Sequence, residues 1–278
     1  MDVSELIRAD LSGKICLVTG ASAGIGEEVA RQLGQLGADV ILGCRSLERG
    51  NAALVRLRRR VPNGRFELNL VDLASQASIR TFARNFSQKH PELHILVNNA
   101  GVWLDEKLLS VDGIELTWAT NVLGYHLLTA VLLEQLRRAP QARIINVASG
   151  MAYGLDLSDV QFERRRFQGS YAYAQSKQAD RMLTWAQSRA LAGLRISANA
   201  VDPGVVDTAM LHHSTPGFRG RPVELGADTI TWLAASQEAD GVTGRFWRDR
   251  RSHPCEFANP DQEEALRALC DRMTGLEA

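Results

Sequence analysis

Short apolar runs alternate with longer amphipathic segments along most of the chain. Several of these runs are nearly continuous in Val, Ile, Leu and Ala, which is typical of parallel strands covered on both faces. The pattern predicts strands at Ile15–Thr19, Val40–Cys44, Arg65–Asp72, Ile95–Asn98, Arg143–Ala148, Ile196–Val201 and Arg245–Trp247. The segments between them predict helices at Ile25–Leu36, Leu47–Arg60, Ser75–Lys89, Gly113–Arg138, Tyr173–Leu191 and Val223–Ala235, with a last helix over about 260–273.

The regular alternation of strands and helices predicts the α/β fold class. Such a chain forms a doubly wound parallel sheet, here of seven strands, with right-handed crossovers that place helices on both faces. No Pro/Gly/Ser-rich linker, break in composition or internal repeat divides the 278 residues, so we expect a single domain over 1–278. Because ligands of these sheets bind beyond the carboxyl ends of the strands, we expect functional residues in the segments that follow each strand.

A glycine-rich string, TGASAGIG over residues 19–26, lies between the first predicted strand and the first predicted helix. Glycine permits a tight turn and a close approach of the backbone to a pyrophosphate. The helix N-terminus adds unpaired N–H groups and the positive end of its dipole. In this position the string predicts a Rossmann-type dinucleotide-binding domain. The residues that we expect to contact the cofactor are Gly20, Ser22, Ala23, Gly24, Ile25 and Gly26.

The end of the second predicted strand indicates which dinucleotide is bound. In NAD-binding domains an acidic residue about 20 residues beyond the glycines binds the ribose 2′-hydroxyl. Here the strand ends without an acid and Arg45 follows it. An arginine can pair with the 2′-phosphate of NADP(H), which an acid would repel. We therefore expect NADP(H) as cofactor. The alternative is that Arg45 stands there by chance, since 28 of the 32 basic residues are arginines.

A tyrosine and a lysine four residues apart stand at the start of a predicted helix. This spacing places Tyr173 and Lys177 on one helix face, one turn apart. A neighbouring ammonium favours the phenolate and lowers the pKa of a tyrosine from its usual value near 10, which suits proton exchange with a substrate oxygen. Ser149 ends a predicted strand and can hydrogen-bond a substrate carbonyl. Asn121 lies within a long predicted helix, where the residue type alone indicates little.

Together these strings resemble the short-chain dehydrogenase/reductase family over about residues 14–247. The resemblance rests on TGASAGIG (19–26), VDL (71–73), NNAG (98–101), Asn121, Ser149, YAQSK (173–177) and PGVVDT (203–208), in that order. It implies an oxidoreductase that interconverts a carbonyl and an alcohol by hydride transfer, with a catalytic tetrad of Asn121, Ser149, Tyr173 and Lys177. Tyr173 is then the general acid/base and Ser149 positions the carbonyl. Lys177 tunes Tyr173 and holds the nicotinamide ribose, and Asn121 holds a water of the proton relay.

The resemblance implies further cofactor contacts and a place within the family. Asp72 and Leu73 would flank the adenine, Asn99 would lie at a cofactor ribose, and Val206 and Thr208 would meet the nicotinamide carboxamide. The chain is most similar to the retinol dehydrogenase and WW-domain oxidoreductase-like group, which shares the Cys-Arg pair and an Ala-Tyr-x-x-Ser-Lys core. We expect it to depart from that group in lacking an N-terminal apolar anchor and a WW domain. The resemblance therefore bears on the cofactor more than on the substrate.

Composition argues against several other functions. Lys plus Arg and Asp plus Glu both number 32, and no basic stripe is interleaved with aromatics, so we expect no nucleic-acid partner. The four cysteines form no CxxC pair and have no metal-ligand spacing with histidine, so we expect reduced thiols and no metal. The first residues lack a signal-peptide pattern and no apolar stretch approaches ~20 residues. We therefore expect a cytoplasmic protein without a membrane anchor.

The substrate pocket is expected in the segments that follow the fourth, fifth and sixth predicted strands. Segment 205–222 is punctuated by Gly and Pro and is expected to form a mobile lid. The apolar side chains of these segments either line a pocket for an apolar or aromatic carbonyl or alcohol of moderate size, or pack the lid. They are Trp103, Met151, Tyr153, Leu155, Phe167, Met210, Leu211 and Phe218.

Two other functions and the state of assembly stay open at this point. The fold also suits a catalytically silent dinucleotide-binding regulatory or scaffold protein, and an epimerase or dehydratase without net cofactor turnover. A homo-oligomer would form through the helices that carry Asn121 and Tyr173. Their spare apolar residues would serve as core in a monomer: Leu123, Leu127, Leu128, Met182, Leu183 and Trp185.

Overall fold

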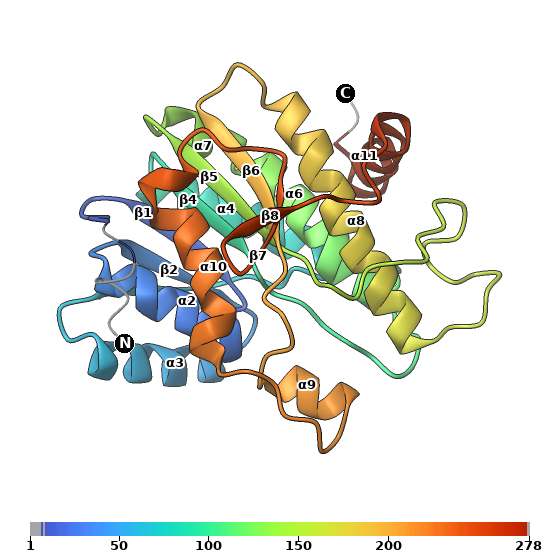
Figure 1. The fold of residues 1–278 in the computed structure, drawn as a ribbon, viewed down its shortest axis with the longest axis horizontal. Coiled ribbons are helices and arrows are strands. Elements are labelled where there is room, and N and C mark those ends of the chain that lie inside the picture. The colour runs from blue at the N-terminus through green and yellow to red at the C-terminus, as the bar shows by residue number, and fades with distance from the viewer. Residues whose placement is uncertain (1–6, 8, 277–278) are drawn as a thin grey trace.

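The computed structural model describes residue 7 and residues 9–276, which form an α/β fold around an eight-stranded sheet. The strands are β1 Ile15–Thr19, β2 Asp39–Cys44, β3 Arg65–Leu70, β4 Ile95–Asn98, β5 Ala142–Val147, β6 Ile196–Val201, β7 Phe246–Arg248 and β8 Arg251–His253. They lie in the order β3-β2-β1-β4-β5-β6-β7-β8 (Figure 1). The order reverses between β1 and β4, which is the point where doubly wound sheets bind their ligands.

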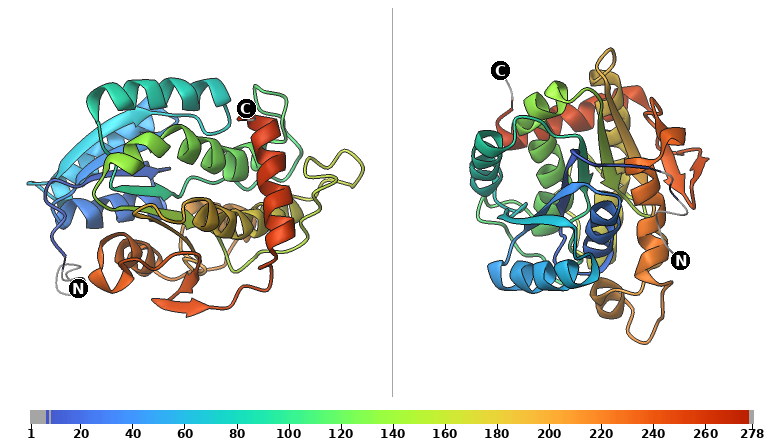
Figure 2. Two further views of the ribbon diagram at one scale, coloured as in Figure 1. Left: turned by 90° about the horizontal axis from the view of Figure 1, so that it is seen from above. Right: turned by 90° about the vertical axis from the view of Figure 1, so that its left-hand side faces the viewer.

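Helices cover both faces of the sheet (Figure 2). They are α2 Gly24–Gln35, α3 Leu47–Arg60, α4 Gln76–Lys89, α5 Leu116–Trp118, the π-helix η1 Ala119–Leu123, α6 Gly124–Val131, α7 Leu133–Arg138, α8 Gly169–Ala190, α9 Ala209–Ser214, α10 Val223–Ala235, the 3₁₀ turn η2 Gln237–Ala239 and α11 Pro260–Thr274. Helices α2, α3 and α10 pack on one face, and α4, α6, α7 and α8 on the other. None of the helices within the described residues is both long and apolar enough to cross a membrane.

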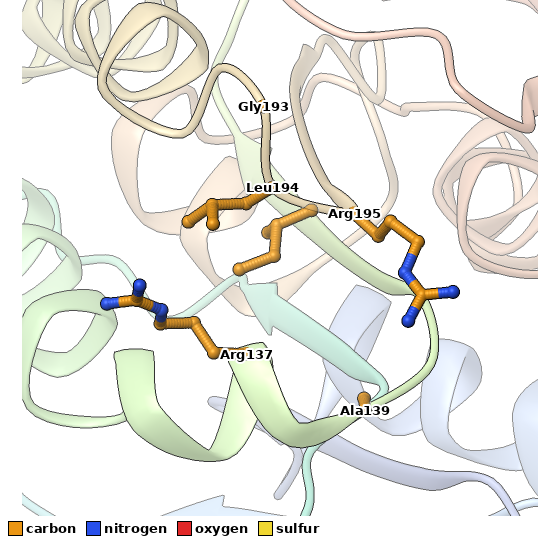
Figure 3. A pocket seen from close by; sticks show the side chains of 6 residues that line it. Arg137, Ala139, Gly193, Leu194 and Arg195 are labelled. Atoms are coloured by element: carbon orange, nitrogen blue, oxygen red, sulfur yellow. The ribbon is translucent and has the colours of Figure 1, made fainter.

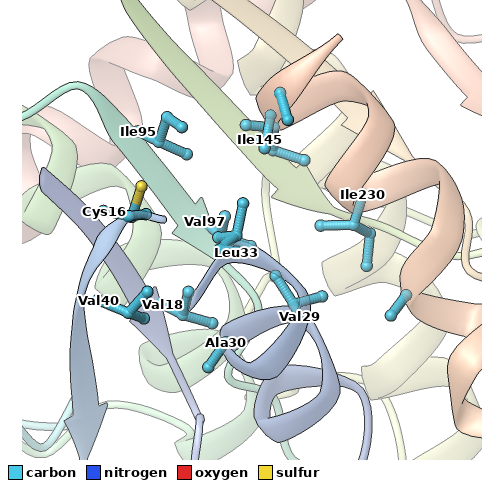
Figure 4. Packing of buried hydrophobic residues seen from close by; sticks show 14 of the residues in the cluster. Cys16, Val18, Val29, Ala30, Leu33, Val40, Ile95, Val97, Ile145 and Ile230 are labelled. Atoms are coloured by element: carbon cyan, nitrogen blue, oxygen red, sulfur yellow. The ribbon is translucent and has the colours of Figure 1, made fainter. Parts of the chain in front are cut away.

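The alternation of side chains along the strands builds a separate core under each helix layer. Successive residues of a strand point to opposite faces. In β1, Val18 packs toward α2 and α10, whereas Leu17 packs toward α4 and α6. Figure 4 shows the first of these cores, where Val29 and Leu33 of α2 meet the strands. Almost all residues of β1, β4 and β5 are buried on both faces of the sheet, which explains why these strands are apolar runs rather than alternating ones.

The sheet has one strand more than the seven that the sequence predicts. Strand β8 pairs with β7 in the antiparallel sense, so the last strands form a hairpin at the sheet edge. Asp249 and Arg250 connect them, with φ of 49° and 57°. Two successive residues at positive φ are what a two-residue hairpin turn requires, but Asn-Gly or Asp-Gly is its usual sequence signal. The Asp-Arg pair does not carry that signal, which is why the hairpin was not predicted.

The helix predicted over 113–138 is interrupted. It begins at Leu116, widens into the π-helix Ala119–Leu123, and divides again between α6 and α7. A Cβ at Gly124 would lie 2.8 Å from the Leu73 Cβ and 2.9 Å from the Leu73 carbonyl oxygen, so the helix passes the loop after β3 at a distance only glycine permits. A π-helical turn often marks a functional site, and this one contains Asn121.

Other boundaries shift by a few residues. Helix α8 begins at Gly169, four residues before the predicted start at Tyr173, and β3 ends at Leu70 instead of Asp72. The predicted lid, 205–222, contains the short helix α9 and protrudes from the rest of the fold (Figure 1). Thr208 caps α9, because its side chain accepts a hydrogen bond from the Leu211 N–H.

The apolar residues considered for an oligomer interface pack within the chain. Leu127 and Leu128 belong to the core beneath α4 and α6. Leu123, Met182 and Leu183 form a further cluster with Leu266 and Cys270 of α11, which lies against α8. Five of the six residues are thus buried core, the alternative that the sequence left open, while Trp185 is half-buried. They give no support to an oligomer, and the oligomeric state stays a prediction.

Candidate active site

The glycine-rich loop joins β1 to α2 and cannot accommodate larger residues. Gly20 has φ +67°, and a Cβ there would lie 2.8 Å from the Ala100 Cα. A Cβ at Gly26 would lie 2.5 Å from both the Gly20 carbonyl oxygen and the Asn99 Nδ2. Asn99 donates from Nδ2 to the Thr19 carbonyl (2.9 Å), which ties the loop to the end of β4. The glycine-rich loop is therefore held in close contact with the loop after β4, at the carboxyl ends of β1 and β4.

The N-terminus of α2 is open to an anion. Its N-cap, Ala23, has no side chain that could accept from the first N–H groups of the helix. Glu27 stands in the first turn, but Arg56 of α3 neutralises it through Nη2 at 2.6 Å. Arg56 also donates to the Ser22 carbonyl oxygen (3.1 Å). The loop thus presents N–H groups and a helix dipole without an uncompensated negative charge beside them.

Two arginines follow β2 near this loop. Arg45 comes directly after β2, and Arg49 lies in the first turn of α3, which Ser46 caps by accepting from the Arg49 N–H (3.2 Å). Both arginines are exposed, and neither forms an ion pair with a carboxylate in the described part of the chain. Asp72 and Leu73 follow β3, the next strand outward, where the Asp72 carboxylate accepts from the Ala74 N–H (3.0 Å) and Leu73 is buried.

Ser149, Tyr173 and Lys177 meet at the carboxyl end of β5. Ser149 stands two residues beyond that strand, where its hydroxyl lowers the pKa of the Tyr173 phenol, and the Lys177 Nζ lies 5.9 Å from the centre of the Tyr173 ring. The ring of Trp103, from the loop after β4, covers Tyr173 with ring centroids 4.8 Å apart. Lys177 is buried one helical turn further on, and its Nζ donates to the Val147 carbonyl at 2.8 Å.

The balance of effects on Tyr173 differs from the sequence-based expectation. Burial raises the pKa of the Tyr173 phenol above its ordinary value, and this outweighs the lowering by the Lys177 ammonium and by the Ser149 hydrogen bond. Lys177 is itself buried, which disfavours its charge, but the Asp180 carboxylate beside it still raises the pKa of Lys177. The lysine is therefore protonated at neutral pH.

Asn121 uses its whole side chain to join two elements. Its Oδ1 accepts from the Val102 N–H (2.9 Å), and its Nδ2 donates to the Val102 carbonyl (3.1 Å) and to the Ser176 Oγ (3.0 Å). The π-helix thereby fixes the loop after β4 against α8, beside Tyr173. Both Nδ2 hydrogens are thus used within the protein, whereas Oδ1 keeps a second lone pair.

Segment 205–222 contacts the glycine-rich loop. Val206 is buried and pairs with Arg221 in an isolated bridge. A Cβ at Gly24 would meet the Thr208 methyl at 3.3 Å, so Thr208 lies against the glycine-rich loop. His213 of α9 contacts Asp105, after β4, with 3.2 Å between His213 Nε2 and the carboxylate.

The expected pocket-lining residues divide into two groups. Trp103 covers the Tyr173 ring, and the Met210 side chain lies 3.9 Å from where a Cβ at Gly101 would stand. Met151 donates its backbone N–H to the Ser149 hydroxyl. Leu155 instead joins the core beneath α11, and Phe167 packs on the edge of Phe162 (5.3 Å). Trp103, Met151 and Met210 thus lie near the site, Leu155 and Phe167 pack elsewhere, and Tyr153 and Phe218 are exposed, so the apolar lining of a substrate pocket stays a prediction.

A hollow of about 200 Å³ lies elsewhere, at the opposite edge of the sheet (Figure 3). Its walls are Arg137, Ala139, Gly193, Leu194, Arg195 and Ile196, which include the start of β6. The site residues follow the carboxyl ends of the strands, so this hollow is unrelated to them.

Two residues with a place in the site were not found from the sequence. Arg49 follows Arg45 at a spacing of four residues, and Asp180 follows Lys177 at a spacing of three. Side chains three or four apart on a helix are neighbours, so the spacing of Lys177 and Asp180 on α8 is a readable signal, whereas Arg45 precedes the cap of α3 and its spacing to Arg49 carries no such signal.

Comparison with known proteins places this geometry in a family. A model of the short chain dehydrogenase family matches residues 14–217. Dehydrogenase/reductase SDR family member 12 of Bos taurus is 34% identical, with 98% of this chain and 89% of that protein covered. Retinol dehydrogenase 13 of Homo sapiens is 33% identical, with 98% and 87% covered.

Solved structures agree with these relatives. The crystal structure of an uncharacterised protein from Mycobacterium paratuberculosis has a TM-score of 0.79 at 28% identity and covers 96% of this chain and 95% of its own. The RhlG/NADP active-site complex of Pseudomonas aeruginosa has a TM-score of 0.69 at 30% identity, with 85% and 94% covered. The chain belongs to the short-chain dehydrogenase/reductase family of nicotinamide dinucleotide-binding oxidoreductases, near its retinol dehydrogenase group.

Proposed function

We propose that this protein is an NADP(H)-dependent oxidoreductase that interconverts a carbonyl and an alcohol, with Tyr173 as general acid/base. The observation that carries the proposal is the meeting of Ser149, Tyr173 and a charged, buried Lys177 beyond the carboxyl end of β5. Beside it, the glycine-rich loop offers the open N-terminus of α2. One site thus combines a proton donor with a place for a dinucleotide.

The residues present suit a nicotinamide dinucleotide. A Cβ at Gly20 or Gly26 would collide with Ala100 or Asn99, so glycine at these positions lets the loop pack against the loop after β4, and the uncapped N-terminus of α2 is left to receive a pyrophosphate. Backbone groups of residues 20–26 would hold the pyrophosphate, Asp72 and Leu73 the adenine, and Asn99 a ribose. Val206 and Thr208 of the lid would hold the carboxamide. The bound nicotinamide supplies or accepts the hydride.

In the proposed mechanism the protein moves a proton and fixes an oxygen. During reduction the Ser149 hydroxyl donates a hydrogen bond to the carbonyl oxygen, and Tyr173 gives that oxygen its phenolic proton. During oxidation the phenolate takes the hydroxyl proton of the alcohol. Lys177 stabilises the phenolate by its charge, and Asn121 keeps the loop after β4 against α8. Trp103 covers the phenol and limits access of water.

The preference for NADP(H) over NAD(H) rests on charge near the end of β2. Arg45 and Arg49 are exposed and have no carboxylate partner among the described residues, so both can pair with a 2′-phosphate. No acid stands at the end of the strand to bind the 2′-hydroxyl of NAD. A relative of known structure, RhlG, was solved with NADP.

For the substrate we propose an apolar or aromatic carbonyl or alcohol of moderate size. Trp103, Met151 and Met210 supply the apolar surface near Tyr173, and a retinol dehydrogenase is among the relatives. The single domain over 1–278 and the cytoplasmic location stay predictions.

The test of the cofactor is a titration of NADPH and NADH, followed by nucleotide fluorescence. Variants Arg45→Ala and Arg49→Ala should each weaken NADPH binding about 10-fold, the loss of one charge-assisted hydrogen bond, and leave NADH unchanged. Arg59→Ala is the matched control, because it removes the same charge from the exposed last turn of α3. Equal or tighter binding of NADH, or no effect at Arg45, would overturn the NADP(H) assignment.

A further inference from the structure

A buried carboxylate lies behind the lysine of the site. Asp180 follows Lys177 by three residues on α8, and its Oδ2 is 2.8 Å from the Lys177 Nζ. The exposed fractions of the two side chains are 1% and 4%. The other carboxylate oxygen, Oδ1, is buried without a hydrogen-bond partner in the described residues. An incompletely paired buried charge is energetically costly. The roles proposed above for the site residues do not explain why the fold contains this carboxylate.

The charges around this pair come from several elements. The ring centroid of Tyr125, on α6, lies 5.2 Å from the Lys177 Nζ. Cys270, on α11, lies close enough to Asp180 for the carboxylate to raise the pKa of the thiol. Burial raises the pKa of both groups, so both are neutral near pH 7. Asp202, after β6, is paired with Arg248 at 2.7 Å. Of the described neighbours of Lys177, Asp180 is thus the one whose charge directly offsets the ammonium.

The offset acts on Tyr173. An ammonium next to a phenol favours the phenolate, and a carboxylate disfavours it. The Lys177 ammonium lowers the pKa of Tyr173, whereas Asp180 raises it. Burial raises the pKa of Asp180 itself to about 6, against the influence of Lys177. Above that pH the carboxylate is charged, and the lysine acts on the phenol as one half of an ion pair.

We propose that Asp180 is a positioning residue for the proposed reaction: it holds the Lys177 Nζ in place and offsets its charge, and so controls how readily Tyr173 loses its proton. This inference rests on the proposed function in taking Tyr173 as the acid/base. It adds Asp180, as a positioning residue, to the four residues proposed for catalysis. Asp180 itself acts through Lys177.

The experiment measures the ionisation of Tyr173 in the protein without cofactor. Near-ultraviolet phenolate absorbance is titrated with pH, and the same titration of a Tyr173→Phe partner is subtracted for each variant. Asp180→Asn keeps the shape and removes the charge, so over the pH range in which Lys177 stays protonated Tyr173 should ionise about one pH unit lower than in the parent protein. With NADPH and a carbonyl substrate, the alkaline limb of kcat/KM should move in the same direction.

Two further variants separate charge from structure. Asp180→Glu keeps the charge, so Tyr173 should ionise within a few tenths of a pH unit of its value in the parent protein, as expected for an electrostatic effect. Glu263→Gln is the control, because Glu263 is equally buried and pairs with Arg189, about 18 Å further along α8. It should leave the Tyr173 titration unchanged. If Asp180→Asn does not fold, Asp180→Ser removes the same charge.

The outcomes distinguish this inference from the proposed function. A folded, neutral Asp180 variant with unchanged Tyr173 ionisation overturns the inference, even if the enzyme turns over NADPH. An Asp180→Glu variant that shifts as far as Asp180→Asn overturns it too, because shape would then decide. A downward shift in a protein that reduces no carbonyl supports the electrostatic role and counts against the proposed function instead.

Discussion

Gly26 offers a direct test of the cofactor loop. A Cβ at this position would lie 2.5 Å from the Gly20 carbonyl oxygen and from the Asn99 Nδ2, whereas ordinary contact begins near 3.4 Å. Gly26→Ala therefore forces the loop or the Asn99 side chain to withdraw by almost 1 Å. The displaced groups are those proposed to hold the pyrophosphate and a ribose. A misplacement of about 1 Å in a binding site can cost on the order of 100-fold, which corresponds to about 2.7 kcal/mol of binding free energy.

The assay is a calorimetric titration of Gly26→Ala with NADPH, beside thermal unfolding of the same sample. Gly43→Ala is the matched control, since its Cβ would meet neighbours at 3.3–3.4 Å and needs an adjustment of only a few tenths of an ångström. We expect NADPH affinity to fall about 100-fold in Gly26→Ala and by less than about threefold in Gly43→Ala. If a folded Gly26→Ala protein binds NADPH as the parent does, the loop is not the pyrophosphate site.

Two predictions concern stability. Leu266 of α11 is fully buried against α8, so Leu266→Ala should cost about 2–5 kcal/mol and lower Tm by roughly 5–15 °C in calorimetry; an unchanged Tm would mean that α11 does not pack there. Burial lowers the pKa of His126 although Asp271 lies 2.7 Å away. The unfolded chain then binds the proton more readily, so the free energy of unfolding should fall as pH drops below about 6.5. His126→Gln should flatten that fall in urea titrations at pH 5 to 8, and an equally steep decline would show that other groups cause it.

The sheet and the helix layers were predictable because they depend on local pattern. Near-continuous apolar runs mark β1, β4 and β5, and the helices between them carry a regular apolar stripe. β8 could not be read in this way, since Arg251–His253 is exposed and polar and its turn has no glycine. A short edge strand of this kind is fixed by its partner and not by its own pattern.

Breaks and starts of helices that depend on distant contacts were also hidden. The π-helix around Asn121 occurs where Gly124 passes the loop after β3. The early start of α8 at Gly169 occurs where the chain crosses Leu104, whose carbonyl oxygen leaves no room for a Cβ. Neither contact has a signal in the neighbouring sequence, because both join residues far apart in the chain.

The residues of the candidate site could be predicted from the sequence, but the effects that together set the pKa of Tyr173 could not. Spacing brings Tyr173 and Lys177 to one helix face, and the order of strands brings Ser149 to them. That burial outweighs the lysine at Tyr173 depends on Trp103 and on the depth of α8 in the fold. Sequence spacing gives neighbours, whereas a pKa depends on everything that surrounds a group.

We propose that Tyr173 passes a proton to a substrate oxygen while NADPH gives up a hydride. The most direct measurement is oxidation of NADPH with a panel of apolar and aromatic ketones and aldehydes, with alcohol products identified, in the parent protein and in Tyr173→Phe. We expect carbonyl reduction by the parent, a loss of kcat of about 10²- to 10⁴-fold in Tyr173→Phe, and equal NADPH affinity in both. Equal turnover in the two proteins, or tight NADPH binding without any product in the parent, would contradict it.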